Sequence, residues 1–202
     1  MLRYFTQEQR QKLEAACVGL AGAGGLGSNA AMMLARCGVG RLVLVDGDSV
    51  EPSNLNRQHY FPRHVGRPKV EALAEQLCEL APALRVEAHR LWLDAENIPP
   101  LLDKAQFWLE CLDDAALKAH FTSAALMSGR SVISASGMGG FGGFGMGRRV
   151  MRSSGGLLCV VGDFRSDVAD APPLAPRVVQ CASMQADAAL ELILTENIQP
   201  LL

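Results

Sequence analysis

The sequence has no excess of either charge and no long apolar run. Its 19 Lys and Arg residues are balanced by 21 Asp and Glu residues, for a net charge of −2. No positive field therefore points to nucleic acid or to a membrane surface, and neither partner is expected. No stretch is long and apolar enough to span a bilayer. The first 19 residues, MLRYFTQEQRQKLEAACVG, are too polar for a signal peptide, so a cytoplasmic location is expected.

Paired cysteines are also missing. None of the six cysteines belongs to a CxxC pair, and a structural zinc site is therefore not expected. Disulfides are not expected in a cytoplasmic chain. Most of the cysteines lie in apolar runs and are predicted to be small buried residues. The six are Cys17, Cys37, Cys78, Cys111, Cys159 and Cys181.

The 202 residues suit one domain, 1–202, with a sizeable core. Short apolar runs bounded by turn residues predict strands at 17–22, 41–46, 107–112, 131–136 and 157–164, and an alternating pattern predicts a further strand at 84–92. Helices are predicted at 7–15, 26–37, 68–80, 94–104, 113–128 and 180–195. This alternation predicts a Rossmann-like α/β fold, doubly wound around a mainly parallel sheet with helices on both faces. A C-terminal glycine-rich extension begins at 137–147.

The segment GAGGLG contains a GxGxxG motif formed by Gly22, Gly24 and Gly27, with Gly25 between them. It follows a predicted strand and opens a predicted helix, the context in which this motif binds nucleotides. Asp46 comes 46 − 27 = 19 residues later, at the end of the next strand, where a carboxylate binds ribose hydroxyls. The alternative is a glycine turn without a ligand.

The segment VEPSNLNRQ, which follows Asp46, favours ATP over NAD. It supplies Asn54, Arg57 and Gln58, and Lys69 begins the next helix. Asp113 ends the fourth predicted strand, so it should face the same crevice as Asp46. Two cations and an added carboxylate suit a polyphosphate with magnesium. Two structural alternatives remain: the two cations are solvated surface charges, and Asp113 caps the following helix.

Three motifs together, GAGGLGSN, VDGDSVEPSNLNRQHYFPRHVGRPK and ECLDDAALK, resemble the adenylating enzymes of ubiquitin-like proteins. This family includes the ThiF and MoeB adenylyltransferases and the nucleotide-binding half of ubiquitin-activating enzymes. The tail APRVVQCASMQADAALELIL is also similar, so the resemblance spans nearly the whole chain. The short length, the missing CxxC pairs and the segment VVGDF most resemble a compact ThiF-like branch associated with thiamine biosynthesis.

The resemblance implies an ATP- and Mg²⁺-dependent reaction. The C-terminal glycine carboxylate of a small ThiS-like sulfur carrier would attack the α-phosphorus, releasing pyrophosphate. Carried over by position, Asp46 binds ribose, Asp113 binds Mg²⁺, and the phosphates contact Asn54, Arg57, Gln58 and Lys69. The catalytic residues implied are Arg57, Lys69 and Asp113. In the family, an arginine at the Arg57 position often reaches the partner subunit's active site, which implies a homodimer.

The chain departs from the family pattern at Glu110 and Lys118, where many relatives carry Asp and Arg. The cysteine that some relatives use for a thioester or persulfide is not clearly marked. Cys159 lies in an apolar strand, while Cys181 starts the predicted last helix, where the helix dipole would lower the pKa of a thiol. A structural role is favoured for Cys181.

The loop 137–147 has two interpretations. It is a flexible connection, or it accepts the carrier's di-glycine tail at Gly139, Gly140 and Phe141. Phe144, with Phe141, would contact the apolar face of the carrier, and Met138 and Met146 suit an adaptable surface.

Four functions compete at this stage. Adenylation of a protein C-terminus, whether a thiamine-type or a molybdopterin-type carrier, accounts for all the motifs. Activation of a small molecule or a modified tRNA base is the second, and the absence of a basic tract argues against tRNA. An NAD-dependent oxidoreductase leaves Arg57 and Lys69 unexplained. A non-catalytic scaffold would not need Arg57, Lys69 and Asp113 together.

Overall fold

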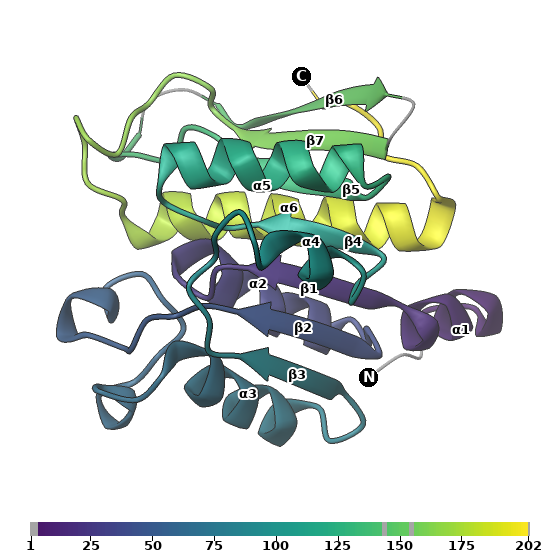
Figure 1. Cartoon of the computed structure of the whole chain (residues 1–202), viewed down its shortest axis with the longest axis horizontal. Helices are drawn as coiled ribbons and strands as arrows, with labels where there is room; N and C mark the ends of the chain where they lie inside the picture. The colour runs from purple at the N-terminus through teal and green to yellow at the C-terminus, as the bar shows by residue number, and fades with distance from the viewer. Residues whose placement is uncertain (1–3, 143–144, 154–155, 202) are drawn as a thin grey trace.

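The chain folds around one seven-stranded sheet in a computed structural model, which describes residues 4–142, 145–153 and 156–201. The strand order is β3-β2-β1-β4-β5-β7-β6. All neighbouring strands are parallel except β6 and β7, which form an antiparallel pair at one edge (Figure 1). The strands are β1 Cys17–Ala21, β2 Arg41–Val45, β3 Arg85–His89, β4 Phe107–Glu110, β5 Ser131–Ala135, β6 Gly147–Ser153 and β7 Gly156–Gly162.

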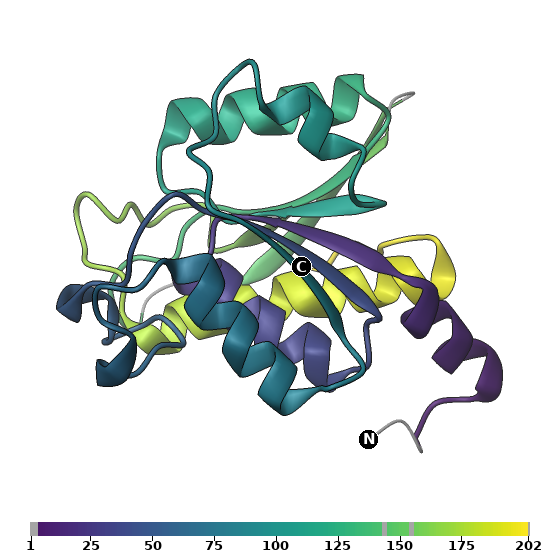
Figure 2. The same ribbon diagram turned by 60° about the horizontal axis from the view of Figure 1, so that its bottom comes forward.

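Helices cover both faces of the sheet, as predicted. Figure 2 shows α4 and α5 on one face, with α2, α3 and α6 on the other. The bounds are α1 Gln7–Ala15, α2 Gly25–Arg36, α3 Lys69–Leu80, α4 Ile98–Leu102, α5 Ala115–Met127 and α6 Ala175–Thr195, with short 3₁₀ turns η1 Pro52–Asn54 and η2 Pro62–His64. The predicted Rossmann-like α/β fold is therefore confirmed.

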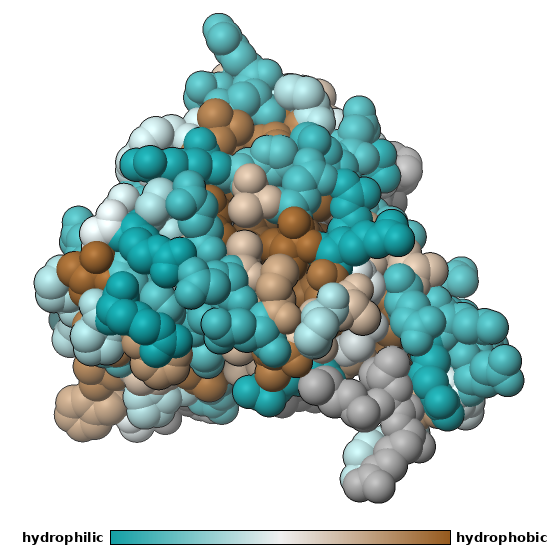
Figure 3. Space-filling view, turned by 90° about the horizontal axis from the view of Figure 1, so that it is seen from below, coloured by the Kyte–Doolittle hydropathy of each residue, from teal (hydrophilic) through white to brown (hydrophobic). Residues whose placement is uncertain are grey.

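Two apolar cores, one on each face, explain why the strands are such continuous hydrophobic runs. The larger core lies under α2, α3 and α6 and includes Leu20 and Leu44. The smaller lies under α4 and α5, where Trp108 packs edge-on against Phe121 with ring centroids 5.5 Å apart. Parallel strands buried on both faces have no polar alternation. Seen from below, the molecule is mainly hydrophilic around its periphery, with apolar side chains gathered near the centre (Figure 3).

The first helix has the predicted bounds, 7–15, and its start is defined by a capping box. Thr6 and Gln9 form a capping box at the start of α1, in which each side chain accepts a hydrogen bond from the other's backbone amide. These bonds satisfy amides that the first helical turn leaves without partners. In the described chain, no helix is long and apolar enough to cross a membrane.

The structure corrects several predicted boundaries. Helix α4 is shorter than the predicted 94–104 and begins at Ile98, because the side chain of Asp94 closes a turn onto the amides of Glu96 and Asn97. Strand β6 was not predicted at all. Its sequence GRRVMRS follows a glycine-rich loop and is rich in arginine, which is typical of an edge strand rather than of a buried one.

Helix α6 begins at Ala175, five residues before the predicted start at residue 180. Pro176 lies in its first turn, where proline costs nothing because that amide has no helical partner. Cys181 therefore lies well inside the helix, and the predicted start of the helix at this cysteine is wrong.

Candidate functional site

A cavity of about 420 Å³ opens at the carboxyl ends of the parallel strands. It lies where the strand order reverses between β1 and β4, the usual binding crevice of an open α/β sheet. Eight residues singled out from the sequence line it, from five separate segments of the chain. They are Gly22, Gly24, Gly25, Asp46, Arg57, Gln58, Lys69 and Asp113.

The glycines after β1 are required by close packing as well as by the cavity. Gly22 has φ +102°, and a Cβ there would lie 2.6 Å from the carbonyl oxygen of Cys111. A Cβ on Gly27 would lie 1.9 Å from the carbonyl oxygen of Gly22. Gly27 does not line the cavity, so its role here is to bring α2 against the turn. Gly24 and Gly25 place the first turn of α2 at the cavity wall.

The carboxylate of Asp46 joins the ends of β1 and β2. Its Oδ2 accepts a hydrogen bond from the amide of Ala23 at 2.7 Å, and its Oδ1 accepts one from the amide of Asp48 at 2.8 Å. Each carboxylate oxygen can accept a second hydrogen bond. Asp46 is half-buried at the cavity, so these remaining positions can serve a ligand.

Arg57 and Gln58 reach the cavity from the loop between β2 and α3. The Nη1 of Arg57 donates to the carbonyl of Ser53 at 3.2 Å and to Asn56 Oδ1 at 2.9 Å. Gln58 is only 9% exposed, and its Oε1 is buried without a hydrogen-bond partner among the described residues. A buried acceptor without a partner is costly, so a donor from a bound ligand would stabilise this residue.

Asn54 lies outside the cavity lining, unlike Arg57 and Gln58 of the same loop. It is buried, and its Oδ1 accepts from the amide of Glu51 at 3.1 Å, which closes η1. In this structure Asn54 shapes the loop that carries Arg57.

Lys69 is nearly buried and forms an ion pair with the carboxylate of Asp48. Its Nζ lies 2.6 Å from Asp48 Oδ2, and its side chain is 8% exposed. Both residues line the cavity. The signal available in the sequence was the spacing of Asp48, two residues after Asp46 at the same strand end.

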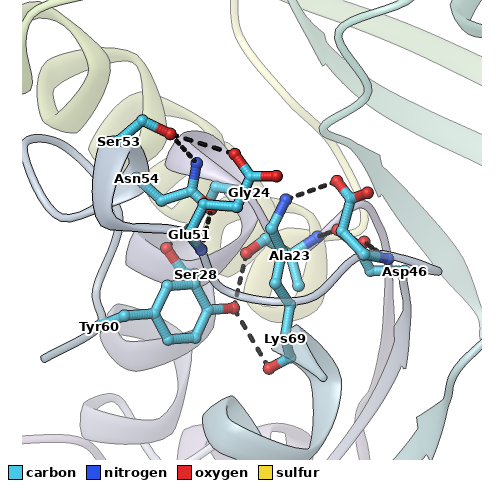
Figure 4. Close-up of polar contacts among 10 residues, drawn as sticks. Ala23, Gly24, Ser28, Asp46, Glu51, Ser53, Asn54, Tyr60 and Lys69 are labelled. Atoms are coloured by element: carbon cyan, nitrogen blue, oxygen red, sulfur yellow. Dashed lines mark hydrogen bonds and ion pairs between the residues drawn. The ribbon is translucent and has the colours of Figure 1, made fainter. Parts of the chain in front are cut away.

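Tyr60 ties the glycine turn to the start of α3. Its buried hydroxyl lies 2.7 Å from the carbonyl of Ala23 and 3.2 Å from that of Lys69 (Figure 4). Burial, and then the negative charge of Asp46, raise the pKa of the Tyr60 phenol. The hydroxyl therefore stays protonated and donates to these carbonyls.

Asp113 lines the cavity but does not cap α5. The cap is Asp114, whose Oδ1 accepts from the amide of Leu117 at 2.7 Å. The alternative role of Asp113 as the helix cap is therefore wrong.

The two departures from the family pattern, Glu110 and Lys118, form one ion pair in which Glu110 is buried and Lys118 is partly exposed. Glu110 is fully buried, and its Oε2 lies 2.5 Å from both Lys118 Nζ and Ser134 Oγ. Its Oε1 accepts from the amide of Leu112 at 2.7 Å. Lys118 also lines the cavity, so this pair forms part of its wall.

Trp92 adds an aromatic wall that sequence analysis did not single out. Its indole ring lies against Gly47, where an added Cβ would come within 2.5 Å of the ring. Trp92 is nevertheless 68% exposed. Leu91 and Leu93 line the cavity beside it. An exposed indole next to Asp46 provides a surface on which an aromatic ring can stack.

Among the described residues of the glycine-rich loop 137–147, only the first part lines the cavity. Gly137 and Met138 line the cavity, whereas Gly139, Gly140 and Phe141 do not. The Gly139 amide donates to Ser166 Oγ at 3.0 Å, and the Gly140 amide donates to the Pro172 carbonyl at 3.0 Å. This part of the loop is packed onto the segment after β7, while Phe141 is 87% exposed. Phe144 lies outside the described residues.

The cysteine that lines the cavity is not an activated nucleophile. Cys111 lines the cavity but is buried, and burial, with Glu110 nearby, raises the pKa of its thiol. Burial raises the pKa of Cys181 to about 11 and that of Cys159 to about 12. The expected dipole effect on Cys181 is therefore wrong, and its structural role is favoured. Cys17 and Cys37 are half-buried and Cys78 is exposed, so burial of the six cysteines is only partly confirmed.

The sequence profile of the ThiF family matches residues 1–201. The chain belongs to the ThiF family. The relatives of this ThiF-family chain include adenylyltransferase and sulfurtransferase uba4 of Aspergillus niger, 42% identical over 128 residues. They also include the sulfur carrier protein ThiS adenylyltransferase of Escherichia coli K12, 37% identical over 135 residues. These matches cover 63% and 66% of this chain.

The matched region is only 27% of the Aspergillus protein and 53% of the Escherichia coli protein. Among solved structures, the fold is similar to that of E. coli tRNA N6-threonylcarbamoyladenosine dehydratase, TcdA, in complex with AMP. That match has a TM-score of 0.86 at 21% identity and covers 96% of this chain and 92% of the other. At this identity the likeness establishes the fold.

Proposed function

We propose that this ThiF-family chain is an adenylyltransferase that activates the C-terminal glycine of a small ubiquitin-like carrier with ATP. The observation that supports this most is the convergence of eight sequence-predicted residues on one cavity at the switch point of the sheet. Two of the relatives named above are adenylyltransferases. A structural neighbour, TcdA, was solved in complex with ATP.

In this proposal the nucleotide lies across the carboxyl ends of β1, β2 and β4. Asp46 binds the ribose hydroxyls, and the first turn of α2 at Gly24 and Gly25 supplies amides and a positive dipole for the phosphates. Arg57 and Lys69 neutralise the charge that develops on the leaving pyrophosphate. The ammonium of Lys69 has three N–H donors, so it can keep its bond to Asp48 while it contacts a phosphate.

The residues present would hold Mg²⁺ together with the phosphates of the nucleotide, and not with protein ligands alone. Within the described residues, no three His, Cys, Asp or Glu side chains gather to hold a metal. Mg²⁺ usually keeps waters and binds through one or two carboxylates plus substrate phosphates. Asp113 would hold it, and the ion would neutralise phosphate charge.

The carrier's carboxylate needs no general base, because it is ionised at neutral pH. The protein's task is to hold the carboxylate and the α-phosphorus in line and to stabilise charge. We propose a ThiS-like carrier of thiamine thiazole synthesis as the substrate and a homodimer as the assembly. A molybdopterin-type carrier, a small molecule and a tRNA base are the competing substrates.

Mass spectrometry tests this directly. A carrier ending in Gly-Gly, incubated with the enzyme, ATP and Mg²⁺, should gain the mass of an AMP group. The same carrier with its last glycine removed serves as the control and should stay unmodified. ATP turnover without a carrier adduct would indicate that the substrate is a small molecule or RNA instead.

A further inference from the structure

The backbone that carries Arg57 and Gln58 is fixed at every polar group. The Arg57 and Gln58 amides both donate to the Asn54 carbonyl, at 3.2 and 2.9 Å. The Gln58 carbonyl accepts from the Tyr60 amide at 2.8 Å. These three bonds are local turn contacts within one loop. Three further groups in this segment bond to side chains of helices.

Those three side chains come from α2 and α3. Asn29 Nδ2 donates to the Arg57 carbonyl at 3.0 Å. Ser28 Oγ accepts from the His59 amide at 2.9 Å, and Gln76 Nε2 donates to the His59 carbonyl at 3.0 Å. Three backbone groups of this segment are therefore held by side chains of two helices, in addition to the bonds within the loop.

Ser28 and Asn29 also bond to the first turn of their own helix. Ser28 Oγ donates to the Gly24 carbonyl at 2.6 Å, and Asn29 Nδ2 donates to the Gly25 carbonyl at 2.7 Å. Gly24 and Gly25 line the same cavity as Arg57 and Gln58. Asn29 thus links two segments of the cavity lining directly, whereas Ser28 links Gly24 to His59, the residue after Gln58. Neither side chain lines the cavity itself.

We propose that Ser28 and Asn29 are positioning residues that fix Arg57 and Gln58 relative to the first turn of α2. This inference rests on the proposed function, because it assumes that the first turn of α2 and the Arg57 loop bind the same polyphosphate. The β- and γ-phosphates would lie between the amides of α2 and the Arg57 loop. A displacement of that loop would weaken contacts to these phosphates and leave the nucleoside contacts intact.

The test compares the affinities for ATP and AMP, with Mg²⁺, by calorimetry. We expect Asn29→Ala to weaken ATP binding by about tenfold, because charge-assisted hydrogen bonds from Arg57 to the phosphates would be weakened or lost. The affinity for AMP, which lacks the β- and γ-phosphates, should change little. In the Arg57→Ala background, Asn29→Ala should lose most of its effect, because coupled residues are non-additive.

The matched control is Asn197→Ala. Asn197 also holds backbone, accepting from the Ile198 amide at 2.8 Å, but it does not line the cavity. It follows α6, whose C-terminal end lies on the opposite side of the molecule from the carboxyl ends of the parallel strands (Figure 1). This variant should keep the preference for ATP over AMP. If Asn29→Ala does not fold, Ser28→Ala removes the second link and is judged by the same ratio.

Equal loss of ATP and AMP affinity, or full additivity with Arg57→Ala, would overturn the positioning role while leaving the proposed function intact. A wild-type protein that binds ATP no better than AMP would overturn the phosphate site and the proposed function together.

Discussion

The carboxylate of Asp46 accepts a hydrogen bond from the amide of Ala23 at 2.7 Å and so joins the ends of β1 and β2. The same carboxylate lines the cavity. Asp46→Asn should therefore lose both stability and nucleotide affinity, because one amide N–H of the new side chain would face a backbone N–H. We expect a loss of about 1–3 kcal/mol in the free energy of unfolding, the cost of an unsatisfied buried donor. Urea unfolding and calorimetry measure the two effects, and unchanged ATP affinity would remove Asp46 from the site.

Arg57→Ala should lower the rate of adenylation with little effect on stability. Among the residues that the structure describes, its guanidinium bonds only to Ser53 and Asn56, both on its own loop. We expect a fall of about 100-fold or more in kcat, the size seen when a group that stabilises transition-state charge is removed. Arg63→Ala is the matched control, since Arg63 lies in the same loop but stacks on Phe61. Equal activities of the two variants would contradict the role of Arg57.

Trp92 should report nucleotide binding by fluorescence. It is the exposed member of the chain's two tryptophans, because Trp108 is fully buried. If the adenine ring stacks on Trp92, ATP and AMP should both quench its emission, and Trp92→Leu should weaken both by a similar factor. That variant would then keep the ATP-to-AMP preference that Asn29→Ala loses. Unchanged emission at saturating ATP would place the base elsewhere.

Acid should weaken the fold through Glu87. Hydrogen bonds from Lys104, and then from Arg41, lower the pKa of Glu87 from 4.5 to about 2. A carboxyl whose pKa is lower in the folded state stabilises the fold above the unfolded pKa, and this contribution is lost as the pH falls from about 4.5 through about 2. Glu87→Gln should therefore be less stable than wild type at pH 7, with the difference shrinking towards pH 2. A difference in the free energy of unfolding that stays constant over this pH range would contradict the ion pairs of Glu87 with Lys104 and Arg41.

Thiol labelling should separate the cysteines by burial. Cys78 is exposed, while Cys159 and Cys181 are buried with pKa values raised to about 12 and about 11. At pH 8 iodoacetamide should modify Cys78 first and leave the other two intact until the protein unfolds. Cys181→Ala should retain adenylation. Rapid labelling of Cys181 in the folded protein would reopen a nucleophilic role for it.

The fold was largely predictable because its central strands are buried on both faces and the elements are separated by clear turn signals. The cavity was predictable in outline for the same reason: the residues at parallel strand ends must share one crevice, which brings Asp46 and Asp113 to it. What the sequence did not reveal depends on tertiary contacts. The pairing of Lys69 with Asp48, the pairing of Glu110 with Lys118, and the anchoring of Arg57 by Asn29 each join distant segments. Strand β6 was missed because an edge strand needs no continuous apolar run.

The central claim is carrier-dependent adenylation, and ATP–pyrophosphate exchange with Mg²⁺ measures it most directly. Exchange should appear when a small carrier ending in Gly-Gly is added, should be absent without it, and should vanish in Asp113→Ala. No exchange with thiamine-type or molybdopterin-type carriers, from a protein that binds ATP, would contradict the claim.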